Sequence, residues 1–382
     1  MSFFLASAVT VSLIMGFYLG FRLLYLFNAC QTGYLNSRSK KIFWFIILSS
    51  ALSFIATRSL SAISDFYLPL IGNYLFSLVI CAFYAMIFVD ILLLVRRLLL
   101  KQYRHYGLKT QMGFIVLTLT LFAVGIFCNK VPQTKYYQLT INKSANVKSL
   151  RIVQISDIHI DTMTSKSTIE KLVQRVNHLK PDYLFITGDT LDSILQPYLD
   201  KQLADIFSQI KTQYGVWVIL GNHEHYGIQR GGESNTINSV VEAFQASNMN
   251  VLNDDAIYDS KTGISLIGRN DFVVSNFNQY RATLQNLMTD VDTTKPVILL
   301  DHQPRNLQLP EQQGVDLMFS GHTHAGQVFP MTLVINAMFI NPWGIYQSGE
   351  FTSIVTSGYG LWGPPIRLMT RAEIVVADIT FN

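Results

Sequence analysis

The chain has 382 residues, which is enough for two domains, and its composition changes after about residue 130. Residues 1–130 carry 11 Lys and Arg against two Asp, a net charge of +9. Residues 131–382 carry 18 Lys and Arg against 23 Asp and Glu, a net charge of −5. Proteins that bind duplex nucleic acid present a basic face, so the acidic second part argues against a nucleic-acid partner. The three cysteines, Cys30, Cys81 and Cys128, all lie in the first part. The second part therefore has neither a disulfide framework nor a thiolate metal site.

The first part contains four apolar runs, at residues 3–27, 42–60, 66–95 and 110–129. Each run approaches or exceeds the ~20 residues that an α-helix needs to cross a bilayer. The sequence therefore predicts an all-α, four-helix transmembrane anchor over residues 1–130, with the lipid bilayer as its partner. No basic residue precedes the first run, which favours a retained helix over a cleaved signal peptide.

Basic residues in the loops predict how this anchor is oriented. The loops after the first and third runs are rich in Lys and Arg, whereas the N-terminal tip has none. Loops with an excess of Lys and Arg stay in the cytoplasm. We therefore expect a multi-pass protein of the bacterial inner (plasma) membrane, with its second part on the outer, extracytoplasmic side. The basic residues are Arg38, Lys40 and Lys41 in one loop, and Arg96, Arg97, Lys101, Arg104 and Lys109 in the other.

Asp90 is the one acidic residue inside a predicted span. An acid at this depth belongs either to an ion or proton pathway or to a pair with a nearby cation. We favour pairing, with Arg96 or Arg97 as the expected partner, because no second acid lies within the predicted spans. An anchor is therefore favoured over a transporter.

The second part begins with a polar segment, residues 131–149, which is expected to be a linker. Residues 150–382 then alternate short apolar runs with helical patterns, which indicates an α/β domain. Strands are predicted at residues 150–155, 183–187, 215–220, 264–268, 296–300, 315–319, 351–357 and 371–380. Helices are predicted at residues 166–179, 196–210, 235–248 and 278–289.

Five polar motifs follow predicted strands of this domain, where open α/β sheets place their functional sites. They offer carboxylate, amide and imidazole groups, which hard and borderline divalent cations accept as ligands. Each motif alone is explained as well by a turn, a helix cap or a surface loop, but all five in this order favour a metal site. The motifs are Asp157-Ile158-His159, Gly188-Asp189-Thr190-Leu191-Asp192, Gly221-Asn222-His223-Glu224, His302 and Gly321-His322-Thr323-His324.

The first three motifs supply the oxygen ligands for two cations about 3.5–4 Å apart. Asp157 and His159 are two residues apart, so a sharp turn after the strand can aim both at one cation. Asp189 has two carboxylate oxygens to share between the cations, and Asn222 offers a neutral amide oxygen to the second.

The histidines complete the expected centre. His302, His322 and His324 would fill the remaining ligand positions. His223 would contact the phosphoryl oxygens of a substrate or protonate its leaving group. Asp192 is expected only to accept a hydrogen bond from a neighbouring ligand.

Residues 150–380 resemble the calcineurin-like metallophosphoesterase superfamily, whose pattern is Asp-x-His, Gly-Asp-x-x-Asp, Gly-Asn-His-Asp/Glu, His and Gly-His-x-His. The sequences Gly-His-Thr-His-Ala-Gly-Gln-Val at 321–328 and Asp-His-Gln-Pro at 301–304 are similar to a bacterial membrane-anchored branch. That branch includes relatives of UDP-2,3-diacylglucosamine hydrolases. Relatives often have Gly at the position of Ala325, a departure that affects no ligand.

The resemblance implies a four-layer αββα sandwich and a division of the ligands between two cations. One cation would be held by Asp157, His159, Asp189 and His324. The other would be held by Asp189, Asn222, His302 and His322. His223 is implied as the catalytic histidine beside the substrate phosphate. Mn, Fe and Zn all suit such a mixed oxygen and imidazole site.

The expected function is hydrolysis of a phosphate or pyrophosphate ester by a hydroxide activated between two cations. The anchor would keep the site near lipid headgroups, which favours a phospholipid or a lipid-linked pyrophosphate as the substrate. The apolar segment 329–345 either lies over the site and dips toward lipid or belongs to the core.

Two other classes of function are weighed against this one. A membrane sensor or transporter with a non-catalytic phosphoesterase-like domain is disfavoured by the intact ligand set. A nuclease is disfavoured by the net charge of −5. A hydrolase of a nucleotide-linked lipid A precursor would need access from the cytoplasm, which is opposite to the side that the loop charges predict.

Overall fold

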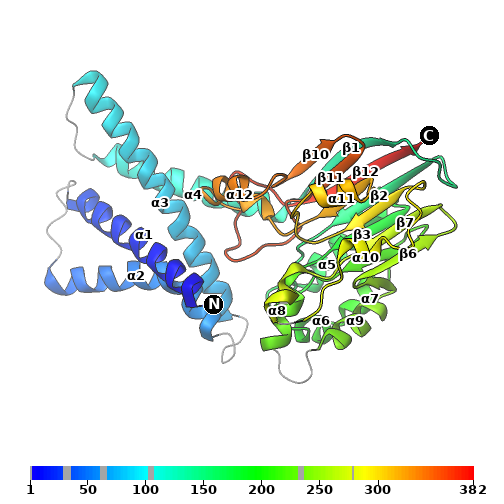
Figure 1. Ribbon diagram of the computed structural model, residues 1–382. Coiled ribbons are helices and arrows are strands. Elements are labelled where there is room, and N and C mark those ends of the chain that lie inside the picture. Colours follow the sequence, from blue (N-terminus) through cyan, green and yellow to red (C-terminus); the bar gives the residue numbers. More distant parts are fainter. Residues whose placement is uncertain (1, 29–35, 61–66, 102–106, 231–235, 278) are drawn as a thin grey trace. The chain divides into compact units, whose positions relative to one another are not determined.

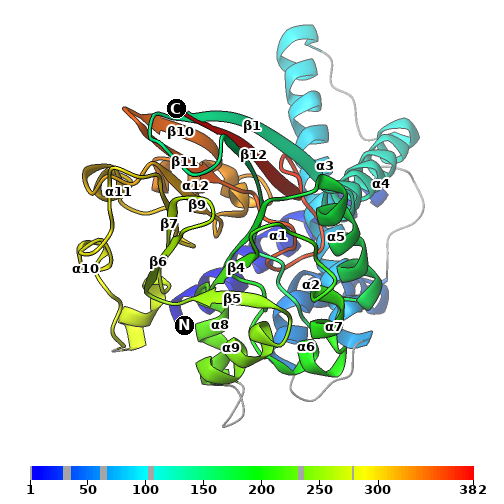
Figure 2. The ribbon, with the colours of Figure 1, turned by 90° about the vertical axis from the view of Figure 1, so that its right-hand side faces the viewer.

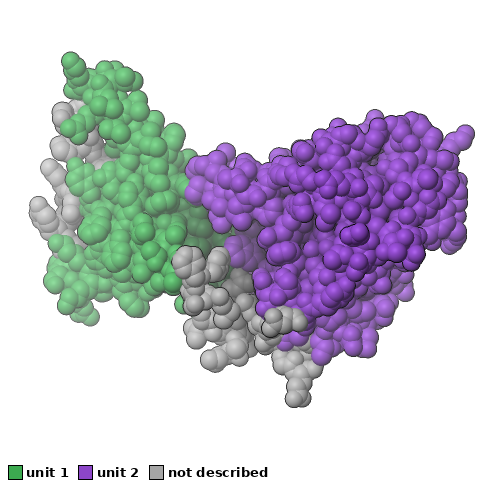
Figure 3. Space-filling model, in the orientation of Figure 1, with its two compact units in different colours: residues 1–128, 363–368 green, residues 129–362, 369–382 purple. Residues whose placement is uncertain are grey.

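The computed structural model describes residues 2–28, 36–60, 67–101, 107–230, 236–277 and 279–382, so Cys30 and Arg104 lie outside the described residues. The chain divides into two compact units, which Figure 3 shows in different colours. One unit consists of residues 1–128 and 363–368, and the other of residues 129–362 and 369–382. A short segment late in the chain therefore packs with the N-terminal helices: the backbone N–H of Arg367 donates to the carbonyl of Gly125 at 3.0 Å.

The first unit contains α1 (Ser2–Asn28), α2 (Ser37–Leu60), α3 (Tyr67–Leu100) and α4 (Leu108–Lys130) (Figure 1). All four helices are long and apolar enough to cross a membrane, as the sequence predicted. Their outer faces carry large apolar side chains such as Phe45 and Leu99, which are 73% and 75% exposed. Such faces are unfavourable in water and suit contact with lipid.

Asp90 of α3 is paired across a helix contact. The guanidinium of Arg22, on α1, binds its carboxylate, and the hydroxyl of Tyr18 donates to it at 2.6 Å. Tyr18 and Arg22 are four residues apart, so both lie on the face of α1 that packs against α3. The expected partners Arg96 and Arg97 lie farther along the same helix as Asp90, and the cation that α1 brings to it could not be read from local sequence.

The second unit is built on two six-stranded sheets (Figures 1 and 2). The first sheet has the order β1 (Gln133–Ile141), β12 (Glu373–Phe381), β2 (Ser149–Ile155), β3 (Tyr183–Thr187), β4 (Val216–Ile219) and β5 (Met249–Leu252). The second has the order β10 (Gly344–Ser348), β11 (Phe351–Val355), β9 (Leu317–Ser320), β8 (Val297–Leu300), β7 (Ile264–Gly268) and β6 (Asp255–Asp259). β2 to β5 run parallel in the first sheet, as do β7, β8, β9 and β11 in the second.

Strand β1 lies in the segment 131–149, which was expected to be a linker. It runs parallel to β12, from Gln133 opposite Glu373 to Ile141 opposite Phe381. Leu139 and Ile141 are buried between the sheets, whereas the alternate residues Gln138 and Thr140 are exposed. The linker prediction is therefore wrong for residues 133–141, because the polar composition belongs to the exposed face of an edge strand.

Three apolar cores separate the four layers of an αββα sandwich, as predicted. Phe207 belongs to the core between the first sheet and its helices, and Phe185 to the core between the two sheets. Leu284 belongs to the core on the far side of the second sheet. Figure 2 shows the two helical layers on opposite sides of the domain. The first layer contains α5 (Lys166–Leu179), α6 (Gln196–Asp200), α7 (Leu203–Phe207) and α9 (Ile237–Gln245), and the second contains α10 (Leu284–Leu287) and α11 (Gln308–Gln312).

Helix α5 has the bounds that the sequence predicted, because its local signals are complete. The Ser165 side chain caps the helix by accepting a hydrogen bond from the backbone N–H of Thr168. Its apolar residues recur at helical spacing and form its buried face, which consists of Ile169, Leu172, Val173 and Val176.

Other helices differ from the prediction. The helix expected at 196–210 is divided into α6 and α7, because Gln202 between them adopts a left-handed backbone conformation with φ of 49°. The helix expected at 278–289 is reduced to α10, and residue 278 lies outside the described residues. The prediction missed α8 (Asn222–Arg230), α12 (Met331–Met338) and α11, together with the strands β5, β6 and β10.

Gln154 joins the two sheets at the edge where their parallel strands end. Its side-chain amide, from β2, donates to the hydroxyl of Thr187 at 2.9 Å and to the carbonyl of Ser320, in β9, at 2.8 Å. The loops after strands of both sheets therefore start from one place.

We predict that removing one charge of the Arg22–Asp90 pair destabilises the helical unit more than removing both. Asp90→Leu leaves a cation among apolar helices, and breaking a buried pair in this way costs about 3–5 kcal/mol. Because Arg22 lies near the end of α1, its long side chain can reach the membrane interface when unpaired, so we expect a smaller loss, about 2 kcal/mol. The measurement is the melting temperature of the detergent-solubilised chain. The double variant Arg22→Leu/Asp90→Leu should recover much of the loss, and additive losses would contradict the pairing.

Candidate metal centre

The loops after β2 and β3 are hydrogen-bonded to each other. The backbone N–H of Asp157 donates to the carbonyl of Gly188, and that of His159 to the carbonyl of Asp189, both at 3.0 Å. Ile160 and Leu191 form a parallel bridge beyond them. These contacts place the first two motifs side by side at the carboxyl edge of the first sheet.

Five of the predicted ligands have the left-handed backbone conformation, with positive φ, that residues other than Gly rarely adopt. Positive φ of this kind costs of order 1–3 kcal/mol for a residue with a Cβ, and it concentrates at functional sites. In each case the turn points the side chain into the space between the loops. The φ values are 54° for Asp157, 51° for His159, 51° for Asp189, 71° for His322 and 49° for His324.

One group of ligand atoms consists of Asp157, His159 and His324. The Nε2 atoms of the two histidines lie 3.0 Å apart, and Nε2 of His324 lies 3.4 Å from Oδ1 of Asp157. One nitrogen or oxygen from each residue lies within 4.8 Å of the others. All three side chains are buried, so they form a compact set of donors for one cation.

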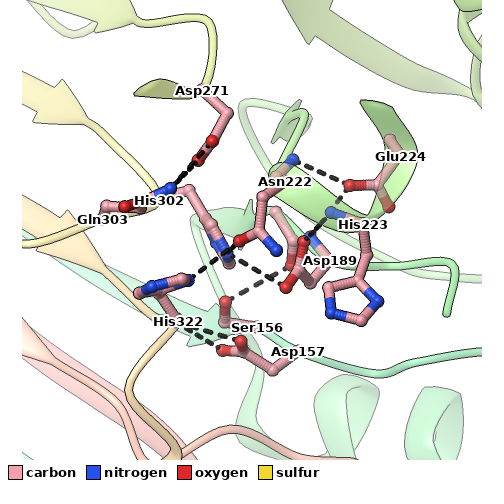
Figure 4. Close-up of polar contacts among 12 residues, drawn as sticks. Ser156, Asp157, Asp189, Asn222, His223, Glu224, Asp271, His302, Gln303 and His322 are labelled. Carbon is pink, nitrogen blue, oxygen red and sulfur yellow. Dashed lines mark hydrogen bonds and ion pairs between the residues drawn. The ribbon is translucent and has the colours of Figure 1, made fainter. Parts of the chain in front are cut away.

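The second group consists of Asp189, Asn222, His302 and His322 (Figure 4). Oδ1 of Asn222 lies 2.8 Å from Nδ1 of His322 and 3.2 Å from Nε2 of His302. Nε2 of His302 lies 3.1 Å from Oδ2 of Asp189. The other ring nitrogen of His302 lies 2.7 Å from the carbonyl oxygen of Thr187, which leaves Nε2 directed at the site.

Asp189 connects the two groups. Its Oδ2 lies 3.1 Å from His302 and 3.8 Å from His159. Burial opposes its charge, but the neighbouring His302 and His223 hold the pKa of Asp189 well below its usual range. Burial likewise opposes the charge on His302, but Asp189 and Asp157 raise the pKa of His302 well above its usual range. The buried carboxylates therefore need positive charge beside them, and divalent cations would supply it.

His223 and Asp192 lie against the first group. Nδ1 of His223 is 2.5 Å from the backbone carbonyl of Asp192, which can only accept, so Nδ1 carries the proton and Nε2 remains for a substrate. Oδ1 of Asp192 lies 3.4 Å from Nδ1 of His159 and 3.7 Å from Nδ1 of His223. All nine residues singled out from the sequence therefore lie in one cluster, and the role of each remains a prediction.

Glu224 is part of this site, and sequence reasoning gave it no role although it closes the third motif. Its buried carboxylate accepts backbone N–H bonds from Gly221 at 2.7 Å, Leu191 at 2.8 Å and Asp189 at 3.1 Å. Burial raises the pKa of Glu224 to about 7. The residue holds the second and third motifs together, and its position after Asn222 and His223 was the available signal.

Glycines at this edge allow the loops to approach closely. A Cβ at Gly221 would collide with the carboxylate of Asp189, and one at Gly321 would collide with Asp157 and Ser156. Any side chain at these positions would displace a candidate ligand.

A second set of buried polar residues, which was not predicted from the sequence, lies near His302. Gln303 donates to both carboxylate oxygens of Asp271, at 2.8 and 3.1 Å, and burial raises the pKa of Asp271 to about 6. His225 is buried, and its Nε2 lies 2.7 Å from Oδ1 of Asn270.

Comparisons with known proteins agree with this geometry. The model of the calcineurin-like phosphoesterase family matches residues 150–326. The chain belongs to the calcineurin-like metallophosphoesterase superfamily. Membership indicates a hydrolase that cleaves phosphoesters with divalent metal ions.

Relatives in this superfamily share more than the catalytic domain. An uncharacterized metallophosphoesterase of Campylobacter jejuni is 29% identical over 352 residues, which cover 89% of each chain. A Helicobacter pylori metallophosphoesterase is 29% identical over 275 residues, 71% of each chain. A transmembrane protein with metallophosphoesterase domain from Danio rerio is 30% identical over 270 residues, 68% of this chain and 60% of that one. The match to the Campylobacter jejuni protein is longer than the segment 131–382, so the similarity extends into the helical part.

We predict that Glu224→Gln weakens the site although it changes one atom. The side-chain NH2 group of the new Gln would face a backbone N–H that, in the wild type, donates to a carboxylate oxygen of Glu224. Leaving such a group unsatisfied costs about 1–3 kcal/mol, and loss of a group that orients ligands lowers metal affinity about 10–100-fold. Thermal melting and metal titration measure the two effects. The matched control is Glu242→Gln, an exposed residue of α9, and equal effects at both positions would contradict a role for Glu224.

Proposed function

We propose that this chain is a membrane-anchored phosphoesterase that uses two divalent cations to hydrolyse a lipid-linked phosphate or pyrophosphate ester. The observation that carries the proposal is the place of Asp189. Its carboxylate lies between two groups of buried or half-buried ligands, each large enough to hold one ion. A shared carboxylate is what a pair of neighbouring cations requires.

The residues that would hold the cations divide on either side of Asp189. Asp157, His159 and His324 would complete one position, and Asn222, His302 and His322 the other. Mn, Fe and Zn suit this mixture of imidazole and oxygen donors. When bound, such a pair supplies activated water and neutralises the charge of the phosphoryl group.

His223 is placed to act on the substrate rather than to hold an ion. Its Nδ1 is engaged by the carbonyl of Asp192, and its backbone N–H donates to Oδ1 of Asp189 at 2.8 Å. Burial lowers the pKa of His223, so its imidazole is neutral near pH 7 until a phosphate approaches. A negative phosphoryl group would favour protonation of Nε2, which could then bind that group or protonate the leaving oxygen.

The four apolar helices support a substrate at the bilayer. An enzyme held at a membrane meets lipid headgroups at high local concentration, whereas a water-soluble ester gains nothing from the anchor. A phospholipid and a lipid-linked pyrophosphate both present the phosphorus ester that the site would accept. The alternative, a sensor or transporter whose domain only binds a ligand, would need the cation ligands but no catalytic histidine.

We predict that His223→Ala lowers kcat by about 10²–10⁴-fold while the metal content is retained. His178→Ala, which changes an exposed histidine of α5 outside the cluster, is the control and should leave kcat unchanged. The assay measures turnover of phospholipids, lipid-linked pyrophosphates and water-soluble esters by the detergent-solubilised full chain.

Each outcome of this assay decides one part of the proposal. Wild-type turnover of water-soluble esters that equals turnover of every lipid substrate would overturn the lipid assignment. Ligand binding without turnover, unchanged in His223→Ala, would favour the sensor or transporter.

We further propose that the chain is a multi-pass protein of the bacterial inner membrane with its catalytic domain on the extracytoplasmic side. Green fluorescent protein fused after Asn382 should then stay dark, whereas alkaline phosphatase at the same position should be active. Fusions after Lys101, in a loop expected in the cytoplasm, should give the opposite pattern. A fluorescent C-terminal fusion would place the site in the cytoplasm and would contradict the proposed orientation.

A further inference from the structure

The α12 segment, residues 328–346, follows the last histidine motif and contains no Asp, Glu, Lys, Arg or His. It consists of the helix α12 and its flanks, with Phe329 on one side and Trp343 and Tyr346 on the other. Nineteen consecutive residues without a charge are uncommon on the surface of a domain whose net charge is −5.

The α12 segment exposes its apolar side chains. None of the eight residues of α12, all of which the structure describes, is buried. Leu333 is 58% exposed, Met338 64% and Ile340 52%. The interpretation of this segment as ordinary core is therefore wrong for α12. A contiguous apolar surface of this kind marks a site of interaction with protein or membrane.

The α12 segment is fixed directly to the candidate metal centre. The hydroxyl of Thr323, between the two histidines of the motif, donates to the carbonyl of Pro342 at 2.7 Å. The ring of Phe339 lies 6.2 Å from the ring of His322, centroid to centroid. Gly326 packs so tightly against Thr332 that a Cβ would collide with its backbone. The apolar surface therefore forms one border of the site.

We propose that the α12 segment is a membrane-binding surface that inserts into the apolar region of the bilayer beside the metal centre. A helix with exposed apolar side chains lies in the interface plane of a membrane, with its apolar face among the acyl chains. Trp343, with Lys135 placed 5.3 Å from its ring, has the amphipathic character of residues at the headgroup level. A lipid whose chains lie beside α12 would present its phosphate to the cations.

The bilayer is the occupant that the rest of the chain favours. The chain carries four helices suited to a membrane, so a bilayer is the apolar phase always available to it. The backbone N–H of Gly360 donates to the carbonyl of Asp157, a candidate ligand, at 2.8 Å. Only Leu361 and Trp362 separate Gly360 from Gly363, the first residue of the segment that packs with the N-terminal helices. Protein interfaces have a polar rim, whereas this segment has no charged side chain.

The test measures whether a label on α12 touches acyl chains. Leu333→Cys is made in a background with Cys30→Ser, Cys81→Ala and Cys128→Ser, labelled with a fluorophore, and reconstituted as the full chain in phosphatidylcholine–phosphatidylglycerol nanodiscs. We expect strong quenching by doxyl-labelled phosphatidylcholine. The matched control is Leu199→Cys on α6, an apolar residue with 49% exposure, which should show no quenching. Equal quenching at the two positions would overturn the proposal.

A second label and a charge substitution guard against a misfolded variant. Met338→Cys should be quenched like Leu333→Cys, and the absence of quenching at both would also overturn the proposal. Leu333→Asp should reduce quenching at Met338→Cys, whereas Leu199→Asp should not. An acidic residue within the apolar region costs enough to lower binding at least about tenfold.

Turnover separates this inference from the proposed function, on which its substrate part rests. If the lipid-linked ester is the substrate, Leu333→Asp should raise its KM at least about tenfold and leave turnover of a water-soluble ester unchanged. Quenching at α12 without turnover of any lipid ester would refute the substrate class and leave the membrane-binding surface in place. Lipid turnover without quenching would refute the surface alone.

Discussion

The site depends on one buried carboxylate that two sets of ligands share. Asp189 is 2% exposed, and its oxygens lie against His159, His302 and the backbone N–H of His223. An isolated charge at this depth would be very unfavourable, so the surrounding positive groups, and cations when bound, determine whether the loops can close around it. The loops after β2, β3, β4 and β8 consequently meet around the side chain of Asp189.

Backbone geometry provides the rigidity that such a centre requires. Left-handed turns at several ligand positions are unfavourable by themselves, and hydrogen bonds between the loops offset their cost. Glu224 contributes most visibly, because its carboxylate collects three backbone N–H groups from two separate loops. The backbone thus holds the ligands in position, which lowers the reorganisation that cation binding would demand.

Two separate parts of the chain carry apolar surfaces suited to a membrane. The N-terminal helices carry apolar faces suited to lipid. They also hold an ion pair, Arg22 with Asp90, among apolar side chains, where either charge alone would be unfavourable. The catalytic unit has its own apolar surface in α12, next to the histidine motif. Under the proposed function, the first would hold the enzyme at the bilayer and the second would give a lipid access to its site.

Local sequence by itself determined the four apolar helices, most of the strands and the set of polar motifs that follow them. Hydropathy, capping at Ser165 and strand periodicity are carried by neighbouring residues, so they can be recognised before folding is considered. Only the tertiary structure decided that β1 is a strand, that Arg22 reaches Asp90, that Glu224 ties two loops, and that α12 is exposed rather than buried. Each of these depends on contacts between distant parts of the chain. Such contacts arise from the packing of sheets and helices against one another, and no short window of sequence contains them.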